Sequence, residues 1–154
     1  MGVEIERKFL LAGDGWREGA VGTLYRQGYL STEADRSVRV RIKGNQGFLT
    51  IKGRSEGLAR LEYEYEIPLD DAGHLLDELC LAPLIEKTRY VIEHAGATWE
   101  VDEFAGVNAG LVLAEVELAS TEEAVDLPPW IGHEVSDDPR YFNANLVANP
   151  YSSW

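Results

Sequence analysis

Charged and apolar residues alternate along several short segments of the chain, beginning with residues 3–9. Successive side chains of a β-strand point to opposite faces of the sheet. In a strand over this range, Glu4, Glu6 and Lys8 share one face, whereas apolar residues occupy the other. A single strand of this kind would ordinarily be half-buried, with its charged face in water. The pattern recurs in five further segments and in both signs of charge, which that simple interpretation does not explain.

The charged residues of those further segments are Arg39 and Arg41, Lys52, Arg60 with Glu62 and Glu64, Lys87 and Arg89, and Glu115 and Glu117. Together the pattern predicts eight strands, at about 3–11, 23–31, 35–43, 47–54, 59–68, 84–94, 97–105 and 110–119. Helices are expected near 69–81, from Ser120 onward, near 138–147 and, as a short one, over 14–20. No repeat or linker interrupts the chain, so we expect residues 1–154 to form one domain.

Eight short antiparallel strands can form either a sandwich or a closed barrel. An eight-stranded barrel encloses room for side chains or for one small ligand. If the charged faces point inward and the helices cover the apolar outer faces, the fold is mainly β within the α+β class, a tunnel with a charged interior. Burying so many charges is costly unless they are paired or bound to ligands. Such an interior therefore requires water and charged ligands.

Composition narrows the possible partners and the location. The chain has 154 residues, a net charge of −13 and a pI of about 4.6, and nucleic-acid binding would need a basic face instead. The single cysteine, Cys80, allows neither a disulfide framework nor a cysteine-based metal site. The three histidines lie apart and make no zinc spacing. Neither a signal peptide nor an apolar membrane span is visible, so we expect a cytoplasmic protein without a membrane partner.

The two signs of charge indicate the chemistry of the expected tunnel. Clustered carboxylates without His or Cys are hard oxygen ligands that suit Mg²⁺ or Mn²⁺. Clustered Arg and Lys side chains suit phosphate oxygens. A cavity with both is suited to a polyphosphate bridged to metal, and phosphoryl transfer depends mostly on positioning and charge neutralisation. No P-loop glycine pattern offers a competing phosphate site.

The ordered set of motifs resembles the CYTH superfamily, also called triphosphate tunnel metalloenzymes. Glu4, Glu6 and Lys8 match its Glu-x-Glu-x-Lys signature, and the resemblance continues in order as far as Arg140-Tyr141-x-Asn143. It implies an eight-stranded antiparallel tunnel that acts on triphosphate compounds with divalent metal. The chain is short, like the small bacterial members associated with inorganic tripolyphosphate. The implied activity is therefore hydrolysis of the terminal phosphoanhydride of tripolyphosphate or a related triphosphate.

The resemblance also implies roles for individual residues. Two Mg²⁺ or Mn²⁺ ions would be held by Glu4, Glu6, Glu115 and Glu117, with Asp102 or Glu62 and Glu64 assisting. The triphosphate would be held by Lys8, Arg39, Arg41, Lys52, Lys87 and Arg89, with Arg60 at the tunnel mouth. Lys8 and the four glutamates of the metal site would be the catalytic residues.

Several alternatives remain open from the sequence. A class IV-type adenylyl cyclase, making cyclic AMP from ATP, would use the same metals but needs a pocket for the nucleoside. A non-catalytic polyphosphate- or nucleotide-binding module would use the same cations but has no need of the carboxylates. Tyr25 and Tyr29 could stack on a nucleoside if they point inward. The physiological triphosphate, the choice between monomer and homodimer, and the role of residues 151–154 are left open.

Overall fold

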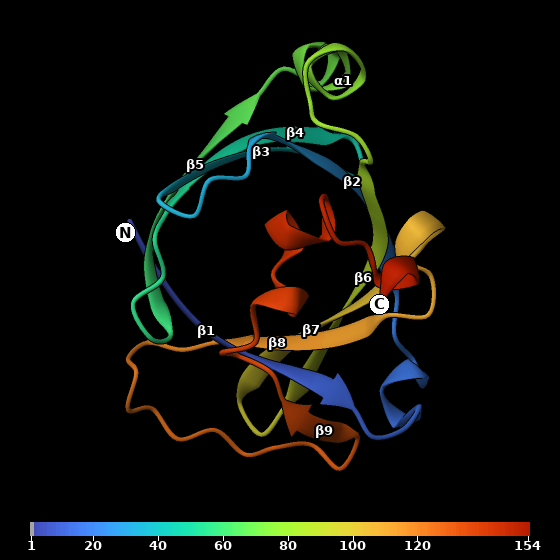
Figure 1. The fold of residues 1–154 in the computed structure, drawn as a ribbon. Coiled ribbons are helices and arrows are strands. Elements are labelled where there is room, and N and C mark those ends of the chain that lie inside the picture. The colour runs from blue at the N-terminus through green and yellow to red at the C-terminus, as the bar shows by residue number, and fades with distance from the viewer. Residues whose placement is uncertain (1) are drawn as a thin grey trace.

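The alternating segments close into an antiparallel barrel in the computed structural model, which describes residues 2–154 (Figure 1). Its strands are β1 (Val3–Leu11), β2 (Gly22–Ser31), β3 (Arg36–Lys43), β4 (Gln46–Gly53), β5 (Ala59–Ile67), β6 (Ile85–His94), β7 (Ala97–Phe104) and β8 (Val112–Glu117). They are ordered β5-β4-β3-β2-β6-β7-β8-β1, and pairing of β1 with β5 closes the circle. The predicted eight-stranded barrel is therefore confirmed.

Strand register brings the charged faces together inside the barrel. Lys8 of β1 lies opposite Glu115 of β8, and Lys52 of β4 lies opposite Glu62 of β5. Directly opposed residues of an antiparallel pair point to the same face. Each of these pairs therefore places a cation beside a carboxylate on the inner wall. The charged residues at every second position of the strands thus line the interior of the barrel.

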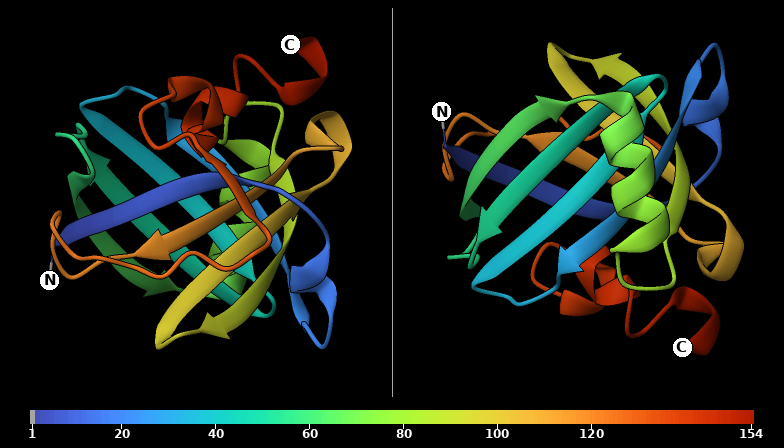
Figure 2. Two further views of the ribbon diagram at one scale, coloured as in Figure 1. Left: turned by 90° about the horizontal axis from the view of Figure 1, so that it is seen from below. Right: turned by 90° about the horizontal axis from the view of Figure 1, so that it is seen from above.

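The outer faces of the strands supply the apolar packing. Helix α1 (Leu69–Glu78) lies across the outside of the barrel, where Ala72 and Leu76 pack against Val40 of β3 (Figure 2). A second cluster on the opposite wall centres on Trp99, whose ring is 5.6 Å from that of Phe9. The helix expected near 69–81 is confirmed, although it ends earlier, at Glu78. No helix within residues 2–154 is long and apolar enough to cross a membrane.

The C-terminal segment lies across one end of the barrel, and in Figure 1 it occupies the centre of the ring. It contains three short 3-10 helices, η3 (Pro139–Tyr141), η4 (Asn143–Leu146) and η5 (Tyr151–Ser153). The single helix expected near 138–147 is thus replaced by two 3-10 turns. The Asp138 side chain accepts a hydrogen bond from the Arg140 backbone N–H and starts the first turn. The expectation that the helices pack outside the barrel holds for α1, whereas η3 and η4 lie across one end of it.

The helix expected from Ser120 onward is wrong, because residues 120–130 form neither helix nor strand. The Glu123 side chain does accept a hydrogen bond, from the Ala119 backbone N–H, but this closes only a local turn. Pro128 and Pro129 then oppose helix in the residues that precede them. The chain continues into β9 (Ile131–Glu134), which the sequence pattern missed, and β9 extends the sheet beside the end of β1.

The two remaining 3-10 helices are η1 (Gly15–Arg17) and η2 (Gly106–Asn108). The first takes the place of the short helix expected over 14–20. It buries Trp16 against Tyr90, with the ring centroids 5.1 Å apart. A single turn is therefore enough to cover this part of the barrel wall.

We predict that Gly28→Ala destabilises the fold. A Cβ at Gly28 would lie 2.6 Å from Leu84 Cδ2 and 2.9 Å from Cys80 Cβ, where the segment after α1 crosses β2. Overpacking of this kind costs about 1–3 kcal/mol of the free energy of unfolding. Gly13→Ala is the control, because a Cβ there meets nothing within 4 Å, and it should change that free energy by at most about 0.5 kcal/mol. Equal urea midpoints for the two variants would contradict the packing described here.

Candidate active site

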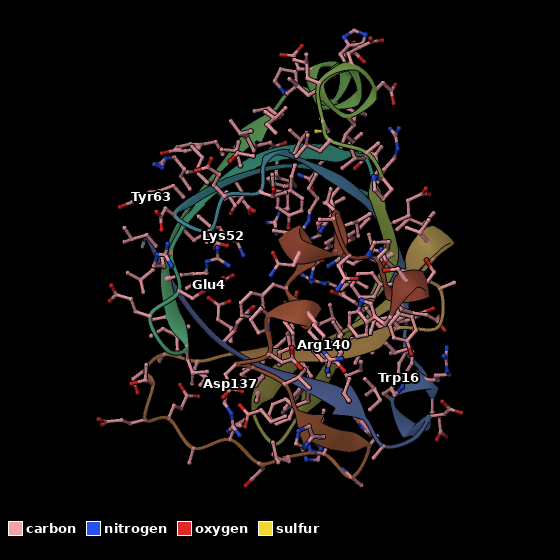
Figure 3. The ribbon with its side chains drawn as sticks, in the orientation of Figure 1. Glu4, Trp16, Lys52, Tyr63, Asp137 and Arg140 are labelled. Atoms are coloured by element: carbon pink, nitrogen blue, oxygen red, sulfur yellow. The ribbon has the colours of Figure 1, made fainter. Side chains whose placement is uncertain are left out.

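The barrel interior holds a cavity of about 540 Å³. Thirteen of the fourteen site residues expected from the sequence line it: Glu4, Glu6, Lys8, Arg39, Arg41, Lys52, Arg60, Glu62, Glu64, Lys87, Arg89, Glu115 and Glu117. Figure 3 shows Glu4 and Lys52 directed into the barrel, whereas Tyr63 of β5 lies on its outside. The structure therefore brings almost all of the predicted residues to one place, and Asp102 is the exception.

On one side of the cavity, Lys52 is shared between two carboxylates. Its Nζ lies 3.0 Å from Glu4 Oε1 and 3.2 Å from Glu62 Oε2. The two acids come from β1 and β5, the strands whose pairing closes the barrel. Burial raises the pKa of Glu62, so this carboxyl would be more readily protonated if Lys52 moved away. The Lys52 ammonium group is thus the cation that neutralises Glu4 and Glu62.

A second group of charges surrounds Glu115. Lys8 Nζ lies 3.4 Å from Glu115 Oε1, and Arg89 Nη2 lies 4.0 Å from Glu115 Oε2. Burial acts to raise the pKa of Glu115, but Lys8 and Arg89 outweigh it and hold the pKa well below its usual range. Lys8 also donates a hydrogen bond to the backbone carbonyl of Tyr141 at 3.1 Å. The C-terminal segment therefore helps to orient a predicted catalytic residue.

Glu6 has too few positively charged neighbours to stay ionised easily. Burial, followed by the charges of Glu115 and Glu4, raises the pKa of Glu6 well above its usual range. Burial and the neighbouring acids Glu4 and Glu100 also raise the pKa of Glu117, which is less enclosed. Carboxylates that raise one another's pKa in this way form a region of excess negative charge. That region would be stabilised by an added cation.

These acidic side chains suit a hard divalent ion, because each of them offers carboxylate oxygens as ligands. Within residues 2–154, however, no three acidic, histidine or cysteine side chains converge closely enough to hold one ion. Glu4 and Glu115 are directed instead to Lys52 and Lys8. The carboxylates therefore have suitable chemistry for a divalent ion. In this structure, the ammonium groups of Lys52 and Lys8 lie beside Glu4 and Glu115 instead.

Asp102 has a different place from the one expected for an assisting metal ligand. It is 1% exposed and does not line the cavity. Its Oδ2 accepts a hydrogen bond from Lys87 Nζ at 2.7 Å, and its Oδ1 accepts one from Arg89 Nε at 2.7 Å. Both carboxylate oxygens are therefore engaged with cations from β6. This placement favours a role in holding Lys87 and Arg89 rather than in binding metal.

The pKa values of this buried group follow from its contacts. Burial acts to raise the pKa of Asp102, but Lys87 and Arg89 prevail and lower it to about 2. Burial lowers the pKa of Lys87 to about 7, with Arg89 and Arg41 acting in the same direction. The charge of Lys87 therefore depends on the negative charge of Asp102, which opposes the loss of its proton.

The remaining predicted cations occupy distinct parts of the cavity. Arg39 Nη2 lies 3.5 Å from Glu64 Oε2, and its buried Nε has no hydrogen-bond partner within residues 2–154. Arg41 Nε donates to the Gln27 side chain at 2.8 Å. Arg60 is more peripheral and donates to the backbone carbonyl of Gly53. Arg39 and Arg41 thus retain N–H groups that an anionic ligand could engage.

Sequence reasoning missed several residues of the cavity wall. Tyr25 of β2 lines the cavity, although the sequence left its direction open, and Gln27 lies on the same face of the strand but is fully buried. In the sequence, Tyr25, Gln27 and Tyr29 recur at every second position, which is a signal of a shared inward face that could have been used. Asn143 Oδ1 accepts hydrogen bonds from Lys87 Nζ and Gln27 Nε2, both at 3.0 Å. Asn143 begins the 3-10 helix η4; it was part of the family motif, but no strand periodicity gave its side chain a role.

Comparisons with known proteins agree with this architecture. The family model described as the CYTH domain matches residues 2–151. A protein of Acetivibrio thermocellus named inorganic triphosphatase is 54% identical over 154 residues, which are 100% of this chain and 99% of that protein. Another of the same name, from Nitrosomonas europaea, is 40% identical over 149 residues, covering 94% of this chain and 96% of that protein.

Solved structures show the same relationship. A crystal structure of an inorganic triphosphatase superposes with a TM-score of 0.66 at 37% identity, covering 93% of this chain and 96% of that chain. A putative adenylate cyclase from Bacillus halodurans superposes with a TM-score of 0.57 at 18% identity, covering 79% of this chain and 84% of that chain. At 18% identity, the similarity to the putative adenylate cyclase shows a shared fold alone.

We predict that Asp102→Asn strongly destabilises the protein at pH 7, by about 3–5 kcal/mol, because buried Lys87 loses its carboxylate partner and buried Arg89 loses the nearest of its carboxylates. Glu103→Gln on the same strand is the control. Glu103 pairs with Arg17 on the surface, and loss of such a pair costs at most about 1 kcal/mol. Urea denaturation of both variants measures the difference.

The effect has a definite pH dependence. The pKa of Asp102 is about 2 in the folded protein, below its ordinary value of 3.8. Its stabilising contribution is therefore fully present above pH 3.8 and is lost as the pH falls toward 2. Asp102→Asn and Glu103→Gln with the same urea midpoint at pH 7 would contradict the buried ion pairs described here.

Proposed function

The chain belongs to the CYTH domain family, and on that basis and the geometry of its cavity we propose that it is a divalent-metal-dependent triphosphatase that cleaves the terminal phosphoanhydride of inorganic tripolyphosphate. One observation carries the proposal: cations and carboxylates from separate strands face one shared cavity of about 540 Å³. A site that only bound an anion would gain nothing from Glu4, Glu6, Glu115 and Glu117. This argues against a non-catalytic polyphosphate-binding module.

The cations would bind the phosphates. Arg39 and Arg41 come from β3, Lys52 from β4, and Lys87 and Arg89 from β6, so they approach the cavity from several walls. Guanidinium groups bind phosphate oxygens in a bidentate manner. A short polyphosphate carries charge along its whole length and could be contacted from all of these walls at once. These contacts would fix the substrate in position and neutralise charge that develops during phosphoryl transfer.

The carboxylates would hold the metal. We propose that Glu4, Glu6, Glu115 and Glu117 bind two Mg²⁺ or Mn²⁺ ions, assisted by Glu62 and Glu64, which line the same cavity. When bound, such ions neutralise phosphate oxygens and activate water for attack. Lys52 and Lys8, which now neutralise Glu4 and Glu115, would be released toward the phosphates. The same lysines therefore serve the carboxylates before binding and the substrate afterwards.

The reaction is a hydrolysis in which water adds to the terminal phosphorus. A new phosphorus–oxygen bond forms to that water, which gives up a proton to the solvent, and the bond from the terminal phosphorus to the bridging oxygen breaks. Pyrophosphate leaves with the bridging oxygen and its electron pair, and the terminal group departs as phosphate. Lys8, which is buried and hydrogen-bonded to Tyr141, would stabilise the charge that accumulates on the oxygens near β1.

Specificity for tripolyphosphate over ATP is expected from the cavity wall. The volume alone does not decide, because cavities of roughly 300–1,000 Å³ hold drug-sized ligands. Tyr25 and Tyr29 are each 4% exposed, so neither offers an open ring face to a nucleobase. Phe48 and Phe142 also line the cavity, but both stand among the charged groups. An adenylyl cyclase would need a nucleoside pocket, and its relatives among solved structures are similar in fold alone.

We predict that tripolyphosphate is hydrolysed with a kcat/KM at least roughly tenfold above that for ATP, since a neutral nucleoside replaces one charged end of the substrate.

Turnover should require added Mg²⁺ or Mn²⁺ and should fall with excess Ca²⁺, which prefers longer bonds and looser geometry. The experiment compares tripolyphosphate, ATP, thiamine triphosphate and pyrophosphate with each metal and assays both phosphate and cyclic AMP.

Each possible result of that panel has a clear meaning. Equal or higher kcat/KM for ATP would overturn the substrate assignment. Cyclic AMP as the main product would establish the cyclase instead. Full turnover after exhaustive chelation would exclude the proposed role of the carboxylates in binding metal.

A further inference from the structure

Tyr25 is surrounded by cations on the inner wall of the barrel. On β2 it lies directly opposite Lys43 of β3 and Lys87 of β6. Arg41 and Arg89 are diagonal neighbours on the same face, and their Cζ atoms are 4.8 Å and 4.9 Å from the centroid of the Tyr25 ring. The Nζ atoms of Lys87 and Lys43 are 5.9 Å and 6.0 Å from it. All four cations are within the distance at which an aromatic face attracts positive charge.

Arg41 differs from most of the other inward cations in its partners. Lys8, Lys52, Lys87, Arg39 and Arg89 each lie within 4.0 Å of a carboxylate oxygen. Within residues 2–154, no carboxylate lies that close to Arg41, although Arg41 is only 9% exposed. Its guanidinium has one side-chain hydrogen bond, to Gln27. A buried charge without an anion is costly, so another group must compensate it.

The ring of Tyr25 is the compensating group that the structure provides. Burial, together with the charges of Arg39 and Arg89, lowers the pKa of Arg41 to about 10, which shows how unfavourable its surroundings are for a further positive charge. The negative face of an aromatic ring offsets part of this repulsion without forming an ion pair. Arg41 can therefore remain charged and directed inward while its N–H groups stay available.

We propose that Tyr25 is a positioning residue that holds Arg41 inside the barrel as an unpaired cation for the phosphates of the substrate. This inference rests on the proposed triphosphatase function and assigns Tyr25 to the binding step. Lys52 and Lys8 must leave a carboxylate to meet the substrate, whereas Arg41 needs no such exchange. The ring acts through Arg41 and does not itself contact the reacting phosphorus.

The test separates the ring from the hydroxyl and from general packing. Tyr25→Phe keeps the ring and Tyr25→Leu removes it, while Arg41→Gln removes the charge that the ring is proposed to hold. Tyr65→Leu is the matched control on β5, because Tyr65 is 56% exposed and does not line the cavity. For each variant and for the double variant Tyr25→Leu/Arg41→Gln, kcat and KM are measured with tripolyphosphate and Mg²⁺. The Kd for tripolyphosphate is measured by calorimetry without metal.

We expect Tyr25→Leu to raise KM and Kd roughly 10- to 30-fold while kcat changes less than about threefold. Tyr25→Phe and Tyr65→Leu should stay within about threefold of the parent protein. Because the ring acts through Arg41, the double variant should bind no more than about threefold more weakly than Arg41→Gln alone.

Three results would overturn the inference. If Tyr25→Phe is as defective as Tyr25→Leu, the hydroxyl rather than the ring is responsible. If the two single defects multiply in the double variant, Tyr25 does not act through Arg41. If Tyr25→Leu melts at a lower temperature but keeps the parent KM and Kd, its role is structural. Failure of the parent protein to bind or hydrolyse tripolyphosphate would remove the proposed function itself, and this inference with it.

Discussion

Charge compensation inside a closed barrel is the constraint on which this structure depends. Carboxylates and cations taken from water must be neutralised by one another, because isolated buried charges cost several kcal/mol each. The antiparallel register meets this requirement by placing Lys8 opposite Glu115 and Lys52 opposite Glu62. The outward apolar faces are then free to pack around Trp99 and under α1, while the C-terminal part of the chain packs against inward apolar residues such as Ile85 and Leu113 at one end of the barrel.

The ionic groups of the interior divide into a fixed set and an exchangeable set. Asp102 is 1% exposed and holds both Lys87 and Arg89, so these three form part of the wall. Glu4 and Glu115, in contrast, line the cavity, where Lys52 neutralises Glu4 and Lys8 lies closest to Glu115, with Arg89 farther away. Under the proposed function, contacts of the second kind would be replaced by a metal ion on one side and a phosphate on the other. This division explains how an interior stable without ligands could also bind highly charged ones.

Sequence periodicity predicted the barrel and most of its lining because both depend on a repeat of two residues. Alternation alone placed Lys8, Arg39 and Glu115 on the charged faces of their strands, and the family resemblance then implied that those faces point inward. Asp102 shared that alternation, but its depth behind Lys87 depends on three-dimensional packing that no pattern of one strand contains. The turns of the C-terminal segment, and Asn143 within them, follow from local hydrogen bonds and proline positions. The four-residue strand β9 is too short to show a period.

The exchange of partners around Lys52 is the most direct test of this description. Crystals of the protein would be soaked with Mn²⁺ and an imido-bridged analogue of tripolyphosphate, and the Mn²⁺ positions located by anomalous scattering. We expect a Mn²⁺ peak bound to carboxylate oxygens of Glu4, Glu6 or Glu115, and Lys52 Nζ moved from Glu4 to a phosphate oxygen. A Lys52–Glu4 contact still near 3.0 Å, with Mn²⁺ bound away from these carboxylates, would contradict it.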